Sequence, residues 1–396
     1  MSKRWMFIPL GMLINMCLGA VYAWSVFKKP LEKLLSIGAT ESGIPFMLFL
    51  AFFAVTMPVV GKMIDRIGPR KIIIIGGAIV ASGWILSSFA KNIIWISITY
   101  GVIAGSGVGV VYGVPLSVVA KWFPDRKGLA LGLTLLGFGF SPFVTAPLSR
   151  ALIEMSGPFV TFRILGIAFL VVITLCALPL RFPKEEEIKG IGGKAGAGVK
   201  AVDMNLKEAL KTKQFYGLWI TYTIGTLAGL MAILITSPVG QEVIKLDAKT
   251  AAFMVSIFAI FNGIGRPIFG YLTDKIGIKI SAVISYVLMI AASALILVSG
   301  EGKTWLYILS FASFWMILGG WLAIAPSATT AFFGLKNYSQ NYGFIFTAYG
   351  AGAILGTILS GVIRDKMGSY IFSFYPIIGL AIIGMAVALF TFKNEK

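Results

Sequence analysis

One arginine, Arg266, stands inside a long apolar segment of this 396-residue chain. It lies eight residues before the polar Asp274, which corresponds to roughly 12 Å along a helix axis. A guanidinium at that depth in a bilayer is costly unless it faces a wet cavity or an anion. Because no acidic residue lies deep inside such a segment, we predict that a substrate carboxylate pairs with Arg266 through two parallel hydrogen bonds. Satisfaction by backbone carbonyls is the alternative.

Other side chains have the spacing or depth to share this site. Asn262 precedes Arg266 by one helical turn on the same face, with a helix–helix hydrogen bond as the alternative role. Tyr112 lies at a similar depth, where a buried phenol needs a partner such as a carboxylate. Phe138 and Tyr349 occupy matching positions 211 residues apart. The wall of the substrate site is expected to be largely apolar and to fit a short carbon chain. It consists of Val21, Phe138, Trp321, Phe346 and Tyr349. The alternative is that the aromatic side chains serve packing alone.

The elements that must position these residues are apolar spans. The chain is 58% hydrophobic and only 13% charged, whereas soluble domains are about a quarter charged. Apolar segments of about 20 residues recur along the chain, and each is long enough to cross a hydrocarbon core about 30 Å thick. We therefore predict an all-α membrane protein with twelve transmembrane helices. They fall near 6–27, 44–62, 72–90, 93–120, 128–153, 159–180, 214–238, 250–273, 280–299, 304–333, 342–363 and 370–392.

A polar, glycine-containing break divides the spans into two sets of six. We therefore expect an N-terminal six-helix bundle at 1–181, a cytoplasmic linker at 182–213 and a C-terminal six-helix bundle at 214–396. The two sets repeat each other, since a shift of 209 superposes Pro58 on Pro267 and a shift of 211 superposes Pro115 on Pro326. Parallel repeats related by a pseudo-two-fold axis are typical of transporters with a substrate site near the midplane.

The charged residues predict the orientation. Placing the N-terminus in the cytoplasm assigns 22 of the 34 Lys and Arg residues to cytoplasmic segments and 11 to external ones, with Arg266 inside a span. The positive-inside rule then puts both termini in the cytoplasm. The net charge of +18 thus reflects topology and not nucleic-acid binding. With no histidine and only two cysteines, we expect no metal site and no cofactor.

A basic loop after the second span carries a motif of fixed spacing, Gly61-x-x-x-Asp65-Arg66-x-Gly68-x-Arg70-Lys71. A degenerate copy with Asp274 follows the eighth span. Its glycines permit a tight turn, and a carboxylate there can fix one conformation of the bundle by pairing with a helix N-terminus or a basic group. The sequence here resembles the major facilitator superfamily, which implies that these residues take part in conformational gating. The alternative is a loop that only sets topology.

Five further segments resemble the oxalate/formate antiporter family. They are Gly19-Ala-Val-Tyr22-Ala-Trp24, Val110-Val-Tyr112-Gly113, Lys121-Trp-Phe-Pro-Asp125-Arg-Lys-Gly128, Asn262-Gly-Ile-Gly-Arg266-Pro267 and Asn341-Tyr-Gly343. The resemblance implies that Arg266 is one of two cations that hold an oxalate dianion in that family. The second, a lysine, is replaced here by Tyr349. A single cation favours a monoanion, as in the similar monocarboxylate porters, whose helix 8 also carries an arginine.

We therefore expect a secondary active transporter of small monocarboxylates such as lactate or pyruvate, coupled to a proton and working by alternating access. Carboxylate exchange of the oxalate:formate type is the first alternative, because no proton acceptor is evident. A non-transporting sensor with the same fold is the second. We expect no enzymatic activity, a plasma-membrane location within the lipid bilayer, a monomer, and a small carboxylate anion and a proton as partners.

Overall fold

Long apolar runs become helices throughout the computed structural model, which describes residues 2–60, 64–123, 127–184, 187, 203–334 and 337–392. Every regular element within these residues is a helix. Eleven of the described helices are long and apolar enough to cross a bilayer. The prediction of an all-α membrane protein is confirmed.

One of the eleven, Ala130–Ala177, contains two spans. Its 48 residues would extend about 72 Å as a straight helix, more than twice the thickness of a hydrocarbon core. The backbone leaves the helical region at Gly157, where φ is 79° and ψ is 168°. A positive φ of this kind is readily adopted only by glycine, and Pro158 follows it. Gly157 lies between the predicted spans 128–153 and 159–180, so the described part of the chain contains twelve spans.

The helices before and after the linker form two groups, which we call the N-terminal group and the C-terminal group. The N-terminal group comprises η1 (Ser2–Met6), α1 (Phe7–Leu18), η2 (Gly19–Ala23), α2 (Trp24–Leu35), α3 (Ala39–Val60), α4 (Ile64–Ile67), α5 (Pro69–Ser87), α6 (Ile93–Ile96), η3 (Ser97–Ala104), α7 (Gly105–Val111), α8 (Gly113–Trp122) and α9 (Lys127–Ala177). The C-terminal group comprises α11 (Leu206–Ala209), α12 (Lys213–Glu242), α13 (Ala248–Ile276), α14 (Ile278–Leu297), α15 (Thr304–Phe333), α16 (Tyr338–Met367), η4 (Tyr370–Ser373) and α17 (Phe374–Thr391).

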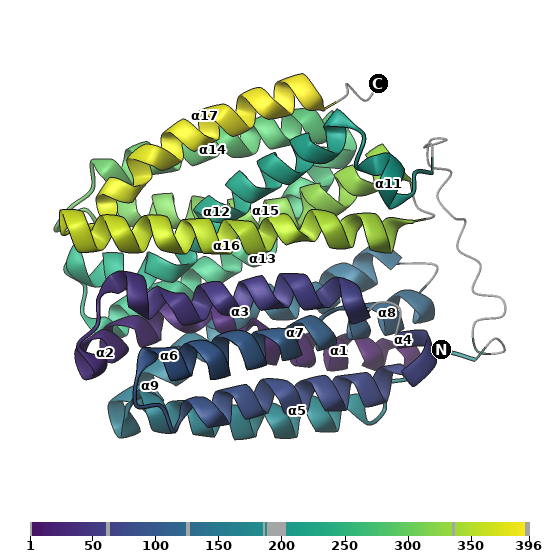
Figure 1. The fold of residues 1–396 in the computed structure, drawn as a ribbon, viewed down its shortest axis with the longest axis horizontal. Coiled ribbons are helices and arrows are strands. Elements are labelled where there is room, and N and C mark those ends of the chain that lie inside the picture. Colours follow the sequence, from purple (N-terminus) through teal and green to yellow (C-terminus); the bar gives the residue numbers. More distant parts are fainter. Residues whose placement is uncertain are drawn as a thin grey trace.

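Figure 1 shows the N-terminal group as the lower layer and the C-terminal group as the upper one, with the long helices roughly parallel. Between the groups, α3 packs on α16 and α9 packs on α13. Both chain termini lie at the same end of the bundle, which we call the terminal end. The opposite end, where α2 leads into α3, is the far end. The predicted domain boundaries at 181 and 214 stay predictions, since most of the linker lies outside the described residues.

The sequence repeat is visible in the backbone of two tight turns. Gly68 (φ 86°, ψ 149°) precedes α5, and Gly277 (φ 85°, ψ 160°) joins α13 to α14. The two glycines are 209 residues apart and adopt nearly the same conformation, one that favours glycine. Each turn therefore reverses the chain in the same way at the terminal end.

The remaining residues of the gating motif are described only in part. Gly61 lies outside the described residues, and so do the side chains of Asp65 and Arg66. Arg70 and Asp274 are both exposed. The gating role of this loop therefore stays a prediction.

Candidate functional site

Helix α13 positions Arg266 and Asn262. The Asp247 side chain accepts hydrogen bonds from the backbone of Lys249 and Thr250 and so fixes where the helix begins. Arg266 then falls in the interior of the helix and is 9% exposed, while Asn262 is fully buried one turn before it. The amphipathic pattern of α13 thus turns two polar side chains into the protein.

Glycines bring α13 and α15 close together beside these residues. A Cβ added to Gly319 would lie 2.1 Å from the Asn262 carbonyl oxygen, and one added to Gly265 would lie 2.3 Å from that of Met316. These separations are shorter than any van der Waals contact, so both positions need glycine. The close approach lets the Asn262 side-chain amide donate to the Trp315 carbonyl oxygen at 3.1 Å. The helix–helix hydrogen bond that was one of two expectations for Asn262 is therefore present.

The Arg266 guanidinium is only partly satisfied. Its Nη1 donates to the Leu135 carbonyl oxygen of α9 at 3.0 Å. Its Nε and Nη2 are buried without a hydrogen-bond partner among the described residues. No described carboxylate forms an ion pair with it. A buried cation with free donors is unfavourable until an anion fills the site.

Asn262 and Arg266 pack closely against Gly139 of α9. A Cβ on Gly139 of α9 would lie 2.8 Å from Asn262 Oδ1 and 3.6 Å from Arg266 Nη2. Asn262 Oδ1, like Nη2, has no partner among the described residues. The site therefore presents free donors and a free acceptor to the seam between the two helix groups.

Aromatic side chains from both groups surround this seam. Tyr112 interacts electrostatically with Arg266 and meets Phe138 edge-on, with ring centroids 5.2 Å apart. Phe53 contacts both of these rings, at 5.0 and 5.9 Å. Phe53 also reaches across to Phe346 at 5.5 Å. The structure thus brings residues of α3, the junction of α7 and α8, α9 and α16 into one cluster, which we call the axial aromatic cluster.

Tyr349 joins the cluster from α16 as well. Its ring stacks on Phe346 at 5.0 Å and lies 6.0 Å from Phe53. Because Phe53 also contacts Phe138, the predicted repeat mates Phe138 and Tyr349 both contact the same ring. Both therefore face the seam between the groups.

Val21 and Trp321 lie further out. Val21 is buried in the 3-10 segment η2, directly before Tyr22. Trp321 stacks on Tyr222 at 6.1 Å, and Tyr222 contacts Phe346 at 6.5 Å. Trp321 reaches the axial aromatic cluster only through Tyr222, whereas the other predicted wall residues Phe138, Phe346 and Tyr349 belong to it directly.

Several cluster members were not singled out from the sequence. Tyr22 meets Phe138 edge-on at 5.2 Å, and its hydroxyl lies 2.6 Å from that of Tyr349. Tyr342 contacts Phe346 at 5.8 Å. The spacing of Tyr342, Phe346 and Tyr349 on one helical face was a signal for α16. Phe53 and Tyr22 carried no such signal, because their partners are distant in sequence.

At the far end, a contact between α3 and α16 joins the two groups. The Asp365 carboxylate of α16 accepts hydrogen bonds from the backbone N–H groups of Ala39 and Thr40 at 2.8 and 2.9 Å. It also accepts one from the Thr40 hydroxyl at 2.5 Å. Asp365 therefore caps α3, a helix of the other group, and neutralises its positive end.

A second charged contact lies nearby. Arg364 Nε donates to Glu242 at 2.6 Å, and Lys29 of α2 forms an ion pair with the same carboxylate. Glu242 thus joins α2 of the N-terminal group to α12 and α16. Together with the Asp365 cap, this arrangement joins the two groups at the far end on the side of α3 and α16, which we call the far mouth.

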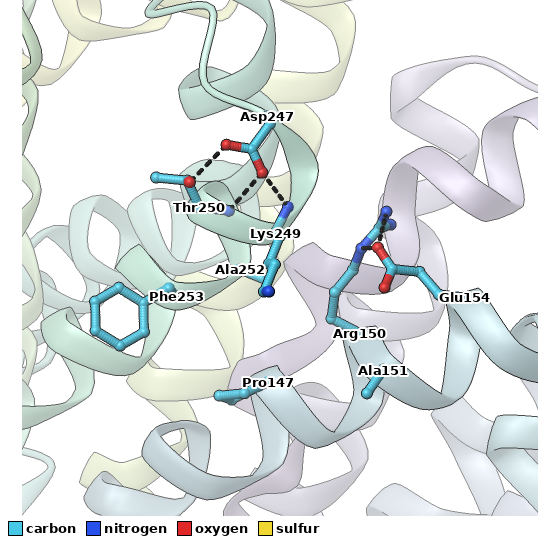
Figure 2. A pocket seen from close by; sticks show the side chains of 9 residues that line it. All are labelled: Pro147, Arg150, Ala151, Glu154, Asp247, Lys249, Thr250, Ala252 and Phe253. Carbon is cyan, nitrogen blue, oxygen red and sulfur yellow. Dashed lines mark hydrogen bonds and ion pairs between the residues drawn. The ribbon is translucent and has the colours of Figure 1, made fainter.

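A cavity opens at the far end of the seam between α9 and α13 (Figure 2), with a volume of about 480 Å³. Arg150 is paired there with Glu154 at 2.7 Å, and the hydroxyl and N–H of Thr250 hold the pKa of Asp247 below its usual value. The cavity is about 24 Å along α13 from Arg266, counted from Thr250. It is lined by Pro147, Arg150, Ala151, Glu154, Asp247, Lys249, Thr250, Ala252 and Phe253. It is therefore separate from the arginine site.

Comparison with known proteins agrees with this fold. Residues 10–357 match the family model described as Major Facilitator Superfamily. The chain is 30% identical over 371 residues to the oxalate:formate antiporter of Oxalobacter formigenes, which covers 93% of this chain and 87% of that protein. It is 25% identical over 353 residues to monocarboxylate transporter 12-B of Danio rerio, covering 83% and 73%.

The solved structure of the nucleoside transporter NupG superposes with a TM-score of 0.74 at 14% identity, covering 98% of this chain and all of that one. This likeness concerns the fold alone. The twelve spans and the family match over most of the chain exclude the enzyme classes and make the protein a membrane transporter. The chain belongs to the major facilitator superfamily.

Proposed function

We propose that this transporter carries small monocarboxylates, such as lactate or pyruvate, and binds their carboxylate at Arg266. The observation that supports this most is the buried guanidinium with free Nε and Nη2 donors and no described carboxylate beside it. A carboxylate has the planar, two-oxygen geometry that a guanidinium binds with two hydrogen bonds. Asn262 assists through the amide proton that it does not donate to Trp315, and Tyr112 assists from the N-terminal group.

The charge of the site favours a monoanion. Arg266 is accompanied by Tyr349, which interacts with it electrostatically at the position where the resemblance to the antiporter family places a second cation. A dianion would keep one negative charge without a partner in a buried site, which is strongly unfavourable. We therefore expect dicarboxylates to compete weakly.

The size of the substrate follows from the wall. Phe138, Phe346 and the ring of Tyr349 are at most 1% exposed and belong to the axial aromatic cluster, whose Tyr112 and Tyr349 interact with Arg266. Such a wall accommodates the short carbon chain of a monocarboxylate of two to four carbons without leaving polar groups unpaired. Larger or multiply polar substrates fit poorly.

Substrate binding and alternating access are linked by the cost of the empty site. An unliganded guanidinium resists enclosure in a closed, dehydrated cluster, and a bound anion removes this penalty. The closed form therefore becomes favourable once the carboxylate is bound. We further propose that the carrier is a monomer in the plasma membrane with both termini in the cytoplasm, as the Lys and Arg distribution predicts.

Proton-coupled symport is our first choice of mechanism. The proton acceptor is then the substrate itself or a water held by a tyrosine, since the chain has no histidine. Carboxylate exchange is the second candidate. It is favoured by the similarity to the oxalate:formate antiporter and requires no proton site.

Proteoliposomes test both mechanisms. With symport, labelled lactate should accumulate when the outside is made acidic, and the gain should vanish when an ionophore collapses the pH gradient. With exchange, uptake should need lactate or another carboxylate inside and ignore the gradient. The Arg266→Gln variant serves as the control for leak. No lactate uptake under either condition would refute the monocarboxylate assignment.

A further inference from the structure

Two phenol side chains join the helix groups inside the axial aromatic cluster. Tyr22 comes from η2 in the N-terminal group and Tyr349 from α16 in the C-terminal group. Their hydroxyl oxygens are 2.6 Å apart, and the residues are 0% and 1% exposed. The pair is thus a short, dry hydrogen bond across the seam.

The pair lies beside the arginine site. Tyr22 and Tyr349 each interact electrostatically with Arg266. The Tyr22 ring also contacts Trp315 at 6.4 Å, the residue whose carbonyl holds Asn262. The two hydroxyls therefore lie within electrostatic range of a carboxylate held by Arg266.

Counting donors shows that the pair is incompletely satisfied. Two phenols bring two protons and four lone pairs, and the hydrogen bond between them uses one proton. Neither hydroxyl makes another hydrogen bond to a described residue. One O–H is left to donate, and it is strengthened as a donor because its oxygen already accepts from the other phenol.

We propose that the Tyr22–Tyr349 hydroxyl pair recognises the oxygen on C2 of the substrate. The carrier then selects 2-hydroxy and 2-oxo monocarboxylates over unsubstituted acids of the same length. This inference rests on the proposed function, because it requires the carboxylate on Arg266. It assigns Tyr22 to the specificity of the site and gives Tyr349 a polar role in place of an apolar one.

The selectivity arises from the free phenol proton. The C2 oxygen of lactate or pyruvate accepts it, whereas propionate offers a methylene and leaves the buried donor unpaired. A site built to hydrogen-bond a substrate oxygen rejects the analogue that lacks it, because its own polar group is then stranded. A substrate hydroxyl can also donate to the lone pairs of the two phenols.

The test compares lactate and propionate as competitors of labelled lactate uptake in proteoliposomes. Wild-type protein should prefer lactate by at least about tenfold. Tyr349→Phe and Tyr22→Phe keep the rings and remove one hydroxyl each, so this ratio should fall in both, because the remaining O–H is no longer strengthened by a second phenol. It should fall to about one when both tyrosines are replaced, because no phenol proton is then left. Tyr307→Phe is the matched control, since Tyr307 is equally buried but donates to the Thr236 carbonyl oxygen at 2.9 Å, away from the seam.

The ratio separates recognition from a merely structural role. If the tyrosine pair only tied the groups together, both variants would lose lactate and propionate uptake in parallel, with the ratio unchanged, and the inference would be overturned. Equal competition by propionate and lactate in the wild type would overturn it too, while leaving the monocarboxylate carrier intact. Failure of both acids to compete would instead refute the proposed function.

Discussion

At the scale of single residues, substitutions can test whether transport depends on the charge of Arg266 or on the size of its side chain. We predict that Arg266→Gln abolishes lactate uptake and that Arg266→Lys restores little of it, because lysine lacks the two-pronged donor geometry. Both variants should insert and fold, since the guanidinium makes few contacts with the described residues, namely a hydrogen bond to the Leu135 carbonyl oxygen and an interaction with the Tyr112 hydroxyl. Uptake assays and the melting temperature of the purified protein measure the two effects. Near-normal uptake by the glutamine variant would remove Arg266 from the site.

At Tyr349 a cation can be added to the site, whereas the Arg266 variants remove or alter one. Tyr349→Lys should increase competition by oxalate, because it adds a second cation next to Arg266. The residue is 1% exposed and faces the seam, so the ammonium would sit beside a substrate anion and not in lipid. The measurements are the expression level of the variant and the competition of unlabelled oxalate with labelled lactate uptake. Unchanged anion preference in a well-expressed variant would show that position 349 does not contact the substrate.

At the scale of helices, the site depends on how closely α13 and α15 approach. We predict that Gly319→Ala lowers the unfolding free energy by about 1–3 kcal/mol, because its Cβ would lie 2.1 Å from the Asn262 carbonyl oxygen. Lactate uptake should fall as well, since Asn262 is displaced. Gly379→Ala is the control, a glycine in α17 whose added Cβ meets no atom within 4 Å. Thermal melts in detergent should show a lower melting temperature for Gly319→Ala and an unchanged one for Gly379→Ala.

The spans themselves follow from the sequence because length and hydropathy dominate in a bilayer. Even the division at Gly157 falls between two predicted spans. The 3-10 turn Gly19–Ala23 does not follow, because it depends on packing: a Cβ on Gly19 would lie 2.3 Å from the Phe138 carbonyl oxygen. Hydrophobic periodicity carries no information on such a contact.

Some residues of the candidate site could likewise be predicted from the sequence, and others could not. Arg266 could be found because a buried charge is rare in a membrane span, and Phe138 and Tyr349 because the repeat relates them. Tyr22 could not be found as a partner of Tyr349, since the two residues are 327 positions apart and an aromatic residue in an apolar span has no distinguishing chemistry. Only the packing of the two helix groups brings them together.

At the scale of the whole molecule, the Asp365 cap should stabilise the state in which the far mouth is closed. We predict that Asp365→Asn shifts the population toward an open far mouth by about tenfold, because it weakens charge-assisted hydrogen bonds across the groups. Spin labels on cysteines at the exposed positions Leu34 and Met367 should report longer distances by pulsed electron paramagnetic resonance.

Asp247→Asn is the matched control for this prediction. Asp247 also caps a helix, but that helix is its own, so the bond does not cross between the groups. The distance distribution should stay as in the parent protein. Equal effects of the two substitutions would assign the change to helix fraying and not to the far mouth.

The same cap makes amide hydrogen exchange a measure of how often the far mouth opens. The amide hydrogens of Ala39 and Thr40 are held by a carboxylate of the opposite helix group, so they are released to water only when the groups separate at that end. Their deuterium uptake therefore counts openings of the far mouth and needs no label in the protein. A substrate that holds the mouth shut should slow the exchange of these two amides, while those deep within α3 keep their own rates.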